Sequence, residues 1–539
     1  MKKNILILIL LMLPSFGLML KPGIFTMHDA HPFRMQQFTG SVADGVFPAR
    51  WAPDAENGYG EPVFNFYGQF PYWVGEIFVL LGFSVIDATK GVFIFSLVAS
   101  GVGMYWLMRR FCSQTYSMLA SVLYVYAPYR SVDIWVRGAL NEAFAFVFFP
   151  LILYFLDEAI ITSKPRHFVG LGLTTALLLI THNLSFVMFS QVLVVWAVYR
   201  IFTTKRFSSV PGLMVAALLS ILLSAFYILP VAIETSLVSL ETATQDGYYN
   251  FQLHYTTLKQ LFVTRFWGYG ASVWSTGDGM SFSVGTVQGI LLGLAGLIAI
   301  YKRSLVSLVL VGIGIFCLFL THGKSDIIWR HLPYLTYIQF PWRYLSPAAF
   351  FIAASIGASF SLIRIPKIIL IAFLVLAIAT NIAYFRPDIW RDTTDAEYFS
   401  GASLHGQMDA HKDFWPKTAG DPPRVLAPKD PWVESGLAAV TQVTRATAAQ
   451  TYAVVVESDQ ASIVFPTVYF PGWTALVDGV QQEVYPHPDS GLITIDLSSD
   501  NRNVILRFID TWPRVLGNII SAAALLGIIS FLTLRHAKN

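Results

Sequence analysis

Long runs of apolar residues recur along the whole chain, each close to the length that a helix needs to cross a bilayer. A hydrocarbon core about 30 Å thick requires roughly 20 apolar residues in helical conformation. The runs lie at residues 4–20, 87–108, 113–128, 143–161, 168–183, 185–201, 209–230, 284–300, 304–321, 345–362, 367–385 and 515–534. This pattern predicts a polytopic α-helical membrane protein with about twelve transmembrane helices.

Basic residues are concentrated at one end of the predicted helices. With twelve spans, all the short loops that carry them fall on one side of the membrane, and Lys and Arg are enriched in cytoplasmic loops. The basic clusters are Lys2-Lys3, Arg109-Arg110, Lys164/Arg166, Arg200/Lys205/Arg206, Lys302-Arg303, Arg364/Lys367 and Arg535/Lys538. We therefore expect both termini in the cytoplasm. Because residues 4–20 are not followed by a small-x-small cleavage site, we expect a retained first helix rather than a signal peptide.

The polar sequence is concentrated on the opposite side. A long outer loop at 21–86 follows the first run, and its end, from Phe70 to Ile86, is apolar enough to lie on the membrane. Further outer loops are expected at 129–142, 231–283 and 322–344. We predict a transmembrane domain at 1–385, an extracytoplasmic β-rich domain at 386–514, and a last helix with a cytoplasmic tail at 515–539.

The predicted β-rich domain opens with a polar, Pro-rich stretch and continues with short β-favouring runs. These runs lie at 452–457, 461–470, 474–477, 480–485, 492–497 and 503–509. Asp478-Gly479 is a strong two-residue hairpin signal, and further turns are expected at 489–491 and 498–502. The pattern predicts a small β-sandwich docked on the membrane part.

Composition agrees with this architecture and excludes some partners. The chain has 539 residues, of which 55% are hydrophobic and 13% charged, whereas soluble domains carry about 25% charged residues. Its net charge of +3 argues against nucleic acid, because phosphate binding requires a dense basic face. Cys112 and Cys317 lie outside the predicted outer segments, so we expect no disulfide framework. The sequence does not indicate an oligomeric state.

The first outer loop holds the most informative polar residues, a few positions after the first helix. Asp29 lies there between His28 and His31, with Arg34 nearby. A carboxylate with such neighbours suits a general base that accepts a proton from a hydroxyl. His28, Asp29 and His31 could equally ligate a divalent cation. A third possibility is that Asp29 caps the next helix.

Four further charged residues lie at the outer membrane surface. Glu142 follows Arg137 at the mouth of a predicted span, where an ionisable group is costly unless it is partnered or functional. Arg343, in Phe340-Pro341-Trp342-Arg343, either binds a lipid phosphate through its planar fork or extends to the interface. Arg50 lies in an aromatic loop that is also compatible with an interfacial belt.

Several well-known motifs do not occur in the sequence. It contains no Gly-x-x-x-x-Gly-Lys-Ser/Thr loop, no Gly-x-Ser-x-Gly elbow and no His-Glu-x-x-His. Acidic residues in the middle of the predicted spans are scarce, which argues against a proton-coupled transporter.

The layout of one helix followed by a long outer loop with an early acid resembles the GT-C superfamily of membrane glycosyltransferases. Within it, the chain is similar to bacterial membrane proteins labelled 6-pyruvoyl-tetrahydropterin synthase-related, close to the YfhO-like group. The resemblance rests on His28-Asp29-Ala30-His31, Phe47-Pro48-Ala49-Arg50-Trp51, Gly58-Tyr59-Gly60, Arg137-Gly138-Ala139-Leu140-Asn141-Glu142, Phe340-Pro341-Trp342-Arg343 and Phe470-Pro471-Gly472-Trp473. Pterin chemistry does not follow from the label, because the sequence has no zinc-binding histidine triplet.

The resemblance implies a polyprenyl-phosphate-linked sugar as donor and Asp29 as base or metal ligand. Glu142 falls where metal-dependent members place a second acid. Since this chain has Asn141-Glu142 where oligosaccharyltransferases have Asp-x-Glu, a Mg or Mn requirement stays open, with Asp29, His31 and Glu142 as possible ligands and no confident set. His28, His31, Arg34, Arg50, Arg137 and Arg343 are the expected substrate-binding residues.

The expected activity is sugar transfer to an envelope acceptor on the extracytoplasmic side of the bacterial plasma membrane, among membrane lipids. Asp29 and Glu142 are the expected catalytic acids. The alternative is a non-enzymatic binder, transporter or scaffold for lipid-linked glycans. An enzyme requires Asp29, Glu142 and Arg343 to converge on one groove, whereas a binder does not.

Overall fold

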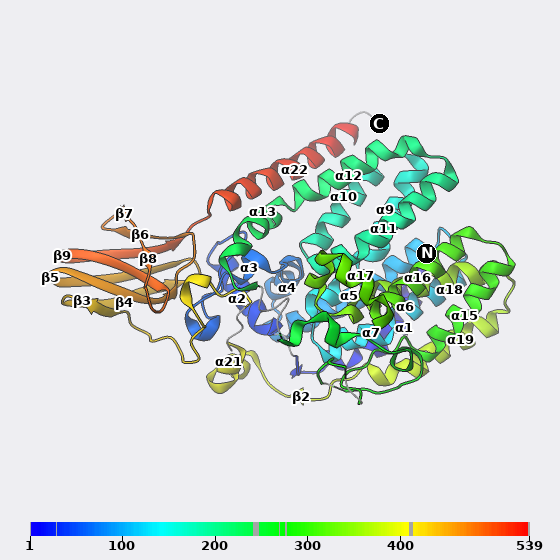
Figure 1. Ribbon diagram of the computed structural model, residues 1–539, viewed down its shortest axis with the longest axis horizontal. Helices are drawn as coiled ribbons and strands as arrows, with labels where there is room; N and C mark the ends of the chain where they lie inside the picture. The colour runs from blue at the N-terminus through cyan, green and yellow to red at the C-terminus, as the bar shows by residue number, and fades with distance from the viewer. Residues whose placement is uncertain are drawn as a thin grey trace.

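The computed structural model describes residues 2–27, 30–240, 247–268, 270–274, 277–408 and 413–536. A large bundle of helices forms most of the molecule, and an antiparallel sheet projects from one end of it (Figure 1). The last helix, α22 (Trp512–His536), runs from the sheet along the bundle (Figure 1). The chain therefore separates its helical and β-rich parts as the apolar pattern predicts.

Helices occupy all twelve of the predicted apolar runs. They are α1 (Lys2–Phe16), α5 (Val85–Met108), α6 (Gln114–Val125), α8 (Leu140–Ala145) with α9 (Phe148–Thr162), α10 (Pro165–Leu179), α11 (Asn183–Thr204), α12 (Val210–Leu223) with α13 (Ala225–Glu234), α15 (Thr286–Tyr301), α16 (Leu305–Thr321), α18 (Leu345–Phe360), α19 (Lys367–Asn381) and α22 (Trp512–His536).

The structure confirms that the chain is mostly helical with several helices that could span a membrane, but it does not confirm twelve of them. Among the described residues, six helical segments are long and apolar enough to cross a membrane, or seven if the bent pair α12–α13 counts as one span. α15 and α16 are apolar but shorter. α18 has 16 residues, nearly all buried, because it lies at the centre of the bundle. Length and burial thus distinguish helices that the apolar pattern treats alike.

A sharp break separates α12 from α13, where the sequence predicts one continuous span. The two helices differ in direction by 71°. At the break, the backbone N–H of Phe226 donates to Ser521 of α22 at 2.9 Å. A Cβ on Gly517 of α22 would lie 2.6 Å from the carbonyl oxygen of Ala225, so only glycine permits this close approach. A neighbouring helix therefore satisfies a backbone group that the break exposes.

Short elements of the first outer loop cover the outer end of the bundle. They are β1 (Ile24–Phe25), α2 (His31–Ala43), α3 (Val63–Phe66) and α4 (Phe70–Leu80). β1 pairs with the distant β2 (Trp390–Arg391), so the start of the outer loop is tied to the segment after α19. Leu80, Leu81 and Phe83 at the end of α4 are more than half exposed, as a segment in contact with lipid would be.

Further short helices connect the larger elements. They are α7 (Pro128–Ser131), α14 (Leu258–Phe262), α17 (Asp326–His331), α20 (Asp395–Tyr398) and α21 (Gly401–Gln407).

The β-rich part is one curled antiparallel sheet. Its strands are β3 (Trp432–Ser435), β4 (Ala438–Ala446), β5 (Ala449–Val468), β6 (Trp473–Val477), β7 (Val480–Gln482), β8 (Tyr485–Pro486) and β9 (Leu492–Phe508). The order is β3-β5-β9-β6-β7, with β4 also on β5 and β8 also on β9. The predicted Asp478-Gly479 hairpin is confirmed, since Val477 pairs with Val480 and both turn residues have positive φ.

The predicted sandwich of six short strands is wrong in detail. The expected break after residue 457 and the expected turn at 498–502 both lie inside long strands, because β5 and β9 pair with each other through these polar stretches. Register shifts in this pairing bend the strands where the sequence predicts turns. A single sheet can then curl around its own core, which includes the buried Tyr452, Ile463 and Leu506.

Candidate functional site

Two arginines and two carboxylates meet where the second outer segment enters α8. A π-helical turn at Val132–Val136 places Asp133 one turn before Arg137. Nη1 of Arg137 donates both to Oδ1 of Asp133 at 2.6 Å and to Oε2 of Glu142 at 2.7 Å. Both carboxylates are buried, with Asp133 at 0% and Glu142 at 1% exposure. The expected pair of Glu142 with Arg137 is therefore present.

Arg343 also belongs to this cluster, although it is distant from Arg137 and Glu142 in the sequence. Its Nε lies 3.5 Å from Oε2 of Glu142, the oxygen that Arg137 also contacts. A short turn at Pro341–Tyr344 before α18 carries Arg343, and Nη1 donates to the Ile338 carbonyl and to Gln339. The other oxygen of Glu142 accepts a hydrogen bond from the Tyr129 hydroxyl at 2.6 Å.

The charge of this acid–arginine cluster, formed by Asp133, Arg137, Glu142 and Arg343, follows from burial. Burial and the nearby carboxylate of Glu142 raise the pKa of Asp133 well above its usual range, against the opposing effect of Arg137. The raised pKa favours the protonated form of Asp133. With Asp133 protonated, two guanidinium groups face one carboxylate, and the cluster then has a net positive charge that suits an anion.

Aromatic rings line the arginines of the cluster. The guanidinium of Arg137 lies 4.8 Å from the ring centre of Trp342, and that of Arg343 lies 4.9 Å from Phe340. The two rings are stacked on each other at 4.9 Å. Such rings hold guanidinium groups in a fixed plane at low conformational cost.

The start of the first outer loop lies against this cluster. Nε2 of His31 accepts a hydrogen bond from the backbone N–H of Leu140 at 3.1 Å, two residues before Glu142. The ring proton therefore lies on Nδ1, which is 2.8 Å from the Tyr72 hydroxyl. Met27 is in close contact with Gly138, whose Cβ would lie 2.5 Å from that of Met27. His28 and Asp29 themselves lie outside the described residues.

Arg34, on the next turn of α2, takes part in a different arrangement. Its guanidinium lies 4.5 Å from the ring centre of Tyr67 and interacts with the buried Glu61. Burial, with a further contribution from Asp413, raises the pKa of Glu61 to about 8. A cavity of about 30 Å³ lies beside these groups, between the first outer loop and Phe414. Its volume admits about two water molecules rather than a sugar.

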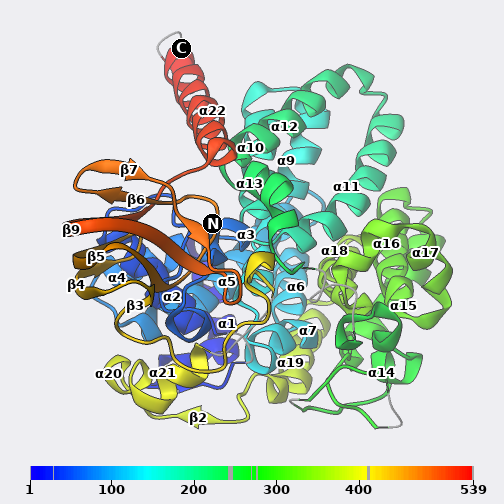
Figure 2. The ribbon, with the colours of Figure 1, turned by 60° about the vertical axis from the view of Figure 1, so that its left-hand side comes forward.

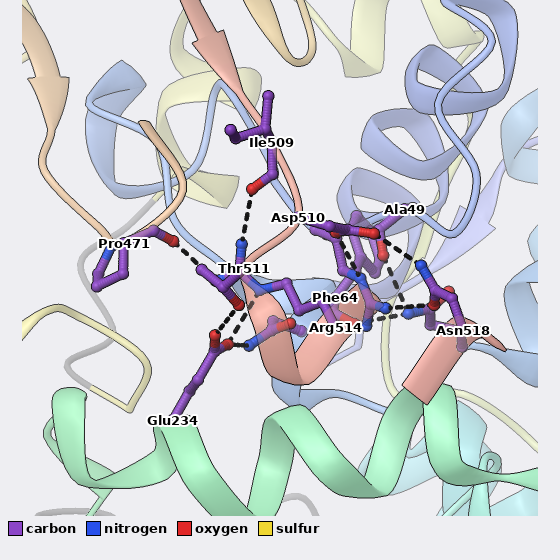
Figure 3. A network of polar contacts seen from close by, with 12 residues as sticks. Ala49, Phe64, Glu234, Pro471, Ile509, Asp510, Thr511, Arg514 and Asn518 are labelled. Atoms are coloured by element: carbon purple, nitrogen blue, oxygen red, sulfur yellow. Dashed lines mark hydrogen bonds and ion pairs between the residues drawn. The ribbon is translucent and has the colours of Figure 1, made fainter. Parts of the chain in front are cut away.

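Arg50, another predicted substrate-binding residue, lies in a separate network with Asp510 and Asn518, and Figure 3 shows these two partners beside Arg514. The Nε of Arg50 is 3.7 Å from Asp510, and Nη2 donates to Asn518 at 3.1 Å. Beside it, Arg514 of α22 donates to Glu234 of α13 at 3.0 Å. Burial lowers the pKa of Arg50 to about 10, despite the opposing effect of Asp510. The structure thus groups Arg50 with the last helix rather than with Arg137.

A family model described as 6-pyruvoyl-tetrahydropterin synthase related domain, membrane protein, matches residues 64–387, well over half of the chain. The chain belongs to this family. The matched range contains the whole acid–arginine cluster as well as Tyr129 and Trp342. No curated protein matches this member of the 6-pyruvoyl-tetrahydropterin synthase-related family.

Three solved membrane glycosyltransferases have a distant structural likeness to this family member. The arabinofuranosyltransferase AftD from Mycobacteria is 16% identical, with a TM-score of 0.47 over 73% of this chain and 27% of its own. The apo oligosaccharyltransferase from Archaeoglobus fulgidus is 11% identical, with a TM-score of 0.43 over 71% and 56%. ArnT from Cupriavidus metallidurans, bound to undecaprenyl phosphate, is 12% identical, with a TM-score of 0.36 over 67% and 60%. The chain spans less than two thirds of the length of each of these proteins.

The divalent metal that the sequence leaves open stays a prediction for this family member, because His28 and Asp29 lie outside the described residues. Within the described residues, no group of three or more His, Cys, Asp or Glu side chains could hold a metal ion. Both oxygens of Glu142 already accept hydrogen bonds, one from Tyr129 and one from Arg137. Nε2 of His31 accepts from Leu140. These contacts occupy Nε2 of His31 and at least one lone pair on each oxygen of Glu142.

Sequence reasoning missed several partners of the cluster. Asp133 and Gln339 each contact a predicted arginine, and Tyr129 contacts Glu142. His182 caps α11 and interacts electrostatically with Glu142. Asp133 precedes Arg137 by one helical turn, and this spacing is the one local signal that could have identified it.

Proposed function

We propose that this family member is a membrane glycosyltransferase that moves a sugar from a polyprenyl-phosphate donor to an envelope acceptor on the extracytoplasmic side. The observation that carries the proposal is the largely buried cluster in which two guanidinium groups, those of Arg137 and Arg343, converge on Glu142. Water would not separate a ligand from these charges at such a site, so their attraction for a phosphate is strong.

In the proposed reaction, Arg343 and Arg137 bind the phosphate of the donor. Asp29 accepts the proton of an acceptor hydroxyl, and the acceptor oxygen attacks the anomeric carbon of the sugar. The bond from that carbon to the phosphate oxygen breaks, and the leaving phosphate takes the bonding electrons. The guanidinium groups stabilise the negative charge that develops there. Attack from the face opposite the phosphate predicts inversion at the anomeric carbon.

Glu142 acts in this scheme by positioning the two arginines. It is fixed by Tyr129 on one oxygen and by both guanidinium groups on the other. Without it, two like charges would face each other in a buried site, which is unfavourable unless an anion is bound. No step passes through a metal ion.

His31 connects the predicted base to the cluster. Its hydrogen bond to the Leu140 N–H ties the start of α2 to the start of α8, which carries Glu142. Asp29 is two residues from His31 in the sequence, and this proximity supports its assignment as the base. The assignment of His28 as a substrate-binding residue rests on sequence alone.

The test is transfer of radiolabelled sugar from native lipid extract, followed by mass analysis of the lipids that co-purify with the full chain. We expect Asp29→Asn and Arg343→Gln to abolish transfer, with Asp29→Asn retaining the co-purifying lipid. The matched control is Arg330→Gln, a solvent-exposed arginine paired with Asp326 outside the cluster. Normal transfer by Asp29→Asn would remove that residue from the mechanism. Lipid binding by the wild type without any transfer would favour a non-enzymatic binder.

A further inference from the structure

An apolar groove of about 680 Å³ runs between α15 and α16. These helices and α14 lie together on the side of the bundle away from the sheet (Figure 2). Leu292, Leu297, Val311 and Ile315 are among the residues that line the groove. Its volume lies in the range of about 300–1,000 Å³ that is typical of small-molecule sites. The groove is therefore large enough for a substantial part of a lipid chain.

Glycines form the floor of the groove along one face of α15. Gly289, Gly293 and Gly296 are spaced by four and three residues, so they lie one above another. A Cβ on Gly293 would meet no other atom within 4 Å, and the nearest atom to a Cβ on Gly296 would be 3.8 Å away. No neighbouring atom of the protein requires glycine at position 293. A lipid chain that lies directly against the backbone of α15 would require it.

The two ends of the groove differ in polarity. Ile300 lines the apolar end, about 16 Å along the helix axis from Gly289. His322 and Lys324 line the other end, and Lys324 is exposed. This polar end belongs to the loop at 322–344, which the basic-residue pattern assigns to the outer side. A ligand with a long apolar chain and an anionic head would match both ends.

The polar end is adjacent to the segment that leads to the acid–arginine cluster. Thr256 bonds to Thr321 at the end of α16, through its backbone N–H at 2.8 Å and through its hydroxyl. His254, two residues before Thr256, packs edge-on against Phe340, with 4.6 Å between the ring centres. Phe340 in turn contacts Arg343. A continuous set of contacts therefore joins the mouth of the groove to the proposed phosphate site.

We infer that the groove binds the isoprenoid chain of a polyprenyl phosphate, with the phosphate on Lys324 and His322, before or after the lipid reaches Arg343. This inference rests on the proposed function. The groove lies between two helices and has one polar end, so it accommodates one chain. A glycerophospholipid carries two chains, and only one of them would find a place there.

The experiment measures lipid binding to the purified full chain in detergent by native mass spectrometry, with undecaprenyl phosphate and phosphatidylglycerol as probes. Gly293→Leu places a side chain on the floor of the groove, and its Cβ meets no other atom of the protein within 4 Å. Its matched control is Gly312→Leu on α16, which also has open space around its Cβ and does not line the groove. Lys324→Gln tests the charge, with Lys302→Gln at the opposite end of the helix pair as control.

We expect Gly293→Leu to weaken binding of undecaprenyl phosphate about ten-fold or more, since each methylene that loses its apolar contact weakens binding about four-fold. Lys324→Gln should weaken it roughly two- to five-fold, as expected for an exposed ion pair. Both controls should bind as the wild type does. Phosphatidylglycerol should bind weakly and should not respond to Gly293→Leu.

Equal binding of undecaprenyl phosphate by Gly293→Leu and the wild type would overturn the inference, and so would preferential binding of phosphatidylglycerol in the groove. The proposed function has an independent readout, because sugar transfer depends on Asp29 and Arg343. Loss of lipid binding in Gly293→Leu from a wild type that transfers no sugar would support the groove and contradict the enzyme. Sugar transfer by the wild type, together with unchanged binding of undecaprenyl phosphate by Gly293→Leu, would support the enzyme and contradict the groove.

Discussion

The buried pair of Arg514 and Glu234 offers a sharp test of how the sheet is fixed to the bundle (Figure 3). Arg514 is 0% exposed and donates to Glu234 and to the carbonyl of Pro471 beside the sheet. Glu234 also accepts from Asn65 of the first outer loop at 2.6 Å. One ion pair therefore connects α22, α13, the sheet and the outer loop.

The size of the effect follows from the burial of both charges. Removing one partner of a buried ion pair typically costs about 3–5 kcal/mol, because the other charge remains without compensation. We expect Arg514→Met and Glu234→Gln each to cost roughly that much in free energy of unfolding. Gln at 234 keeps an acceptor for the Asn65 amide, and the double variant leaves neither partner of the ion pair as an isolated charge. Its cost should therefore be well below the sum of the single costs.

The assay is reversible unfolding of the purified full chain in mixed micelles by titration with SDS, followed by tryptophan fluorescence. A double-mutant cycle gives the coupling energy between the two positions, which we expect to be about 2–3 kcal/mol, toward the upper end of the range for residues in contact. Additivity within about 0.5 kcal/mol would refute the argument, because it would mean that the two charges do not stabilise each other.

Three further predictions concern buried charged residues. Burial raises the pKa of Asp133, and Asn keeps the shape and the hydrogen-bonding groups of the neutral acid, so Asp133→Asn should keep transfer activity nearer to that of the wild type than Asp133→Ala does. A profile of the donor KM against pH checks this, because the KM of the wild type should rise toward high pH as Asp133 ionises and that of Asp133→Asn should not. Burial raises the pKa of Glu61 to about 8. The contribution of its protonated form to stability is therefore fully present below the unfolded pKa of about 4.3 and is lost as pH rises through about 8. Glu61→Gln should flatten the dependence of the unfolding midpoint on pH between 5 and 9, and an unchanged slope would contradict the raised pKa. Arg343→Lys should raise the KM for the donor about ten-fold or more, because an ammonium group lacks the planar fork that binds phosphate, and steady-state kinetics with Arg330→Lys as control would check this.

The apolar pattern predicts the helices well because bilayer thickness imposes one length on every span. It does not distinguish a span from a central helix, and α18 shows why. Its 16 residues are as apolar as those of a lipid-facing helix, but they are buried by protein. It also misses the 71° break before α13, since the group that satisfies the broken backbone, Ser521, is nearly 300 residues away in the sequence.

The polar residues were harder to assign than the helices because their partners are distant in sequence. Arg137, Asp133 and Glu142 lie within ten positions of one another, and their spacing on adjoining turns gives a local signal. Arg50 looks like the others from its neighbours, but its partners Asp510 and Asn518 are more than 450 residues away. No local pattern could have assigned it to the base of the sheet rather than to a phosphate.

The strands provide a similar lesson about polar sequence. Gln460 and Ser498 read as turn residues, yet they pair with each other inside β5 and β9. Polar side chains at the exposed tip of a sheet cost little, because water reaches them while the backbone remains paired. The pattern of apolar and polar residues indicates which residues are buried. It indicates where the chain turns only when the turn also changes which residues are buried.

Burial also explains why one small cluster can serve both stability and chemistry. Glu142 holds Arg137 and Arg343 together in a largely buried site, so the guanidinium groups are already oriented before any ligand arrives. A phosphate that enters meets fixed charges, and little reorganisation is needed to stabilise it. Two arginines left alone would repel each other and separate, and an exposed pair would be screened by water and salt. The carboxylate that neutralises one charge is therefore what allows the remaining positive charge to be buried and directed at an anion.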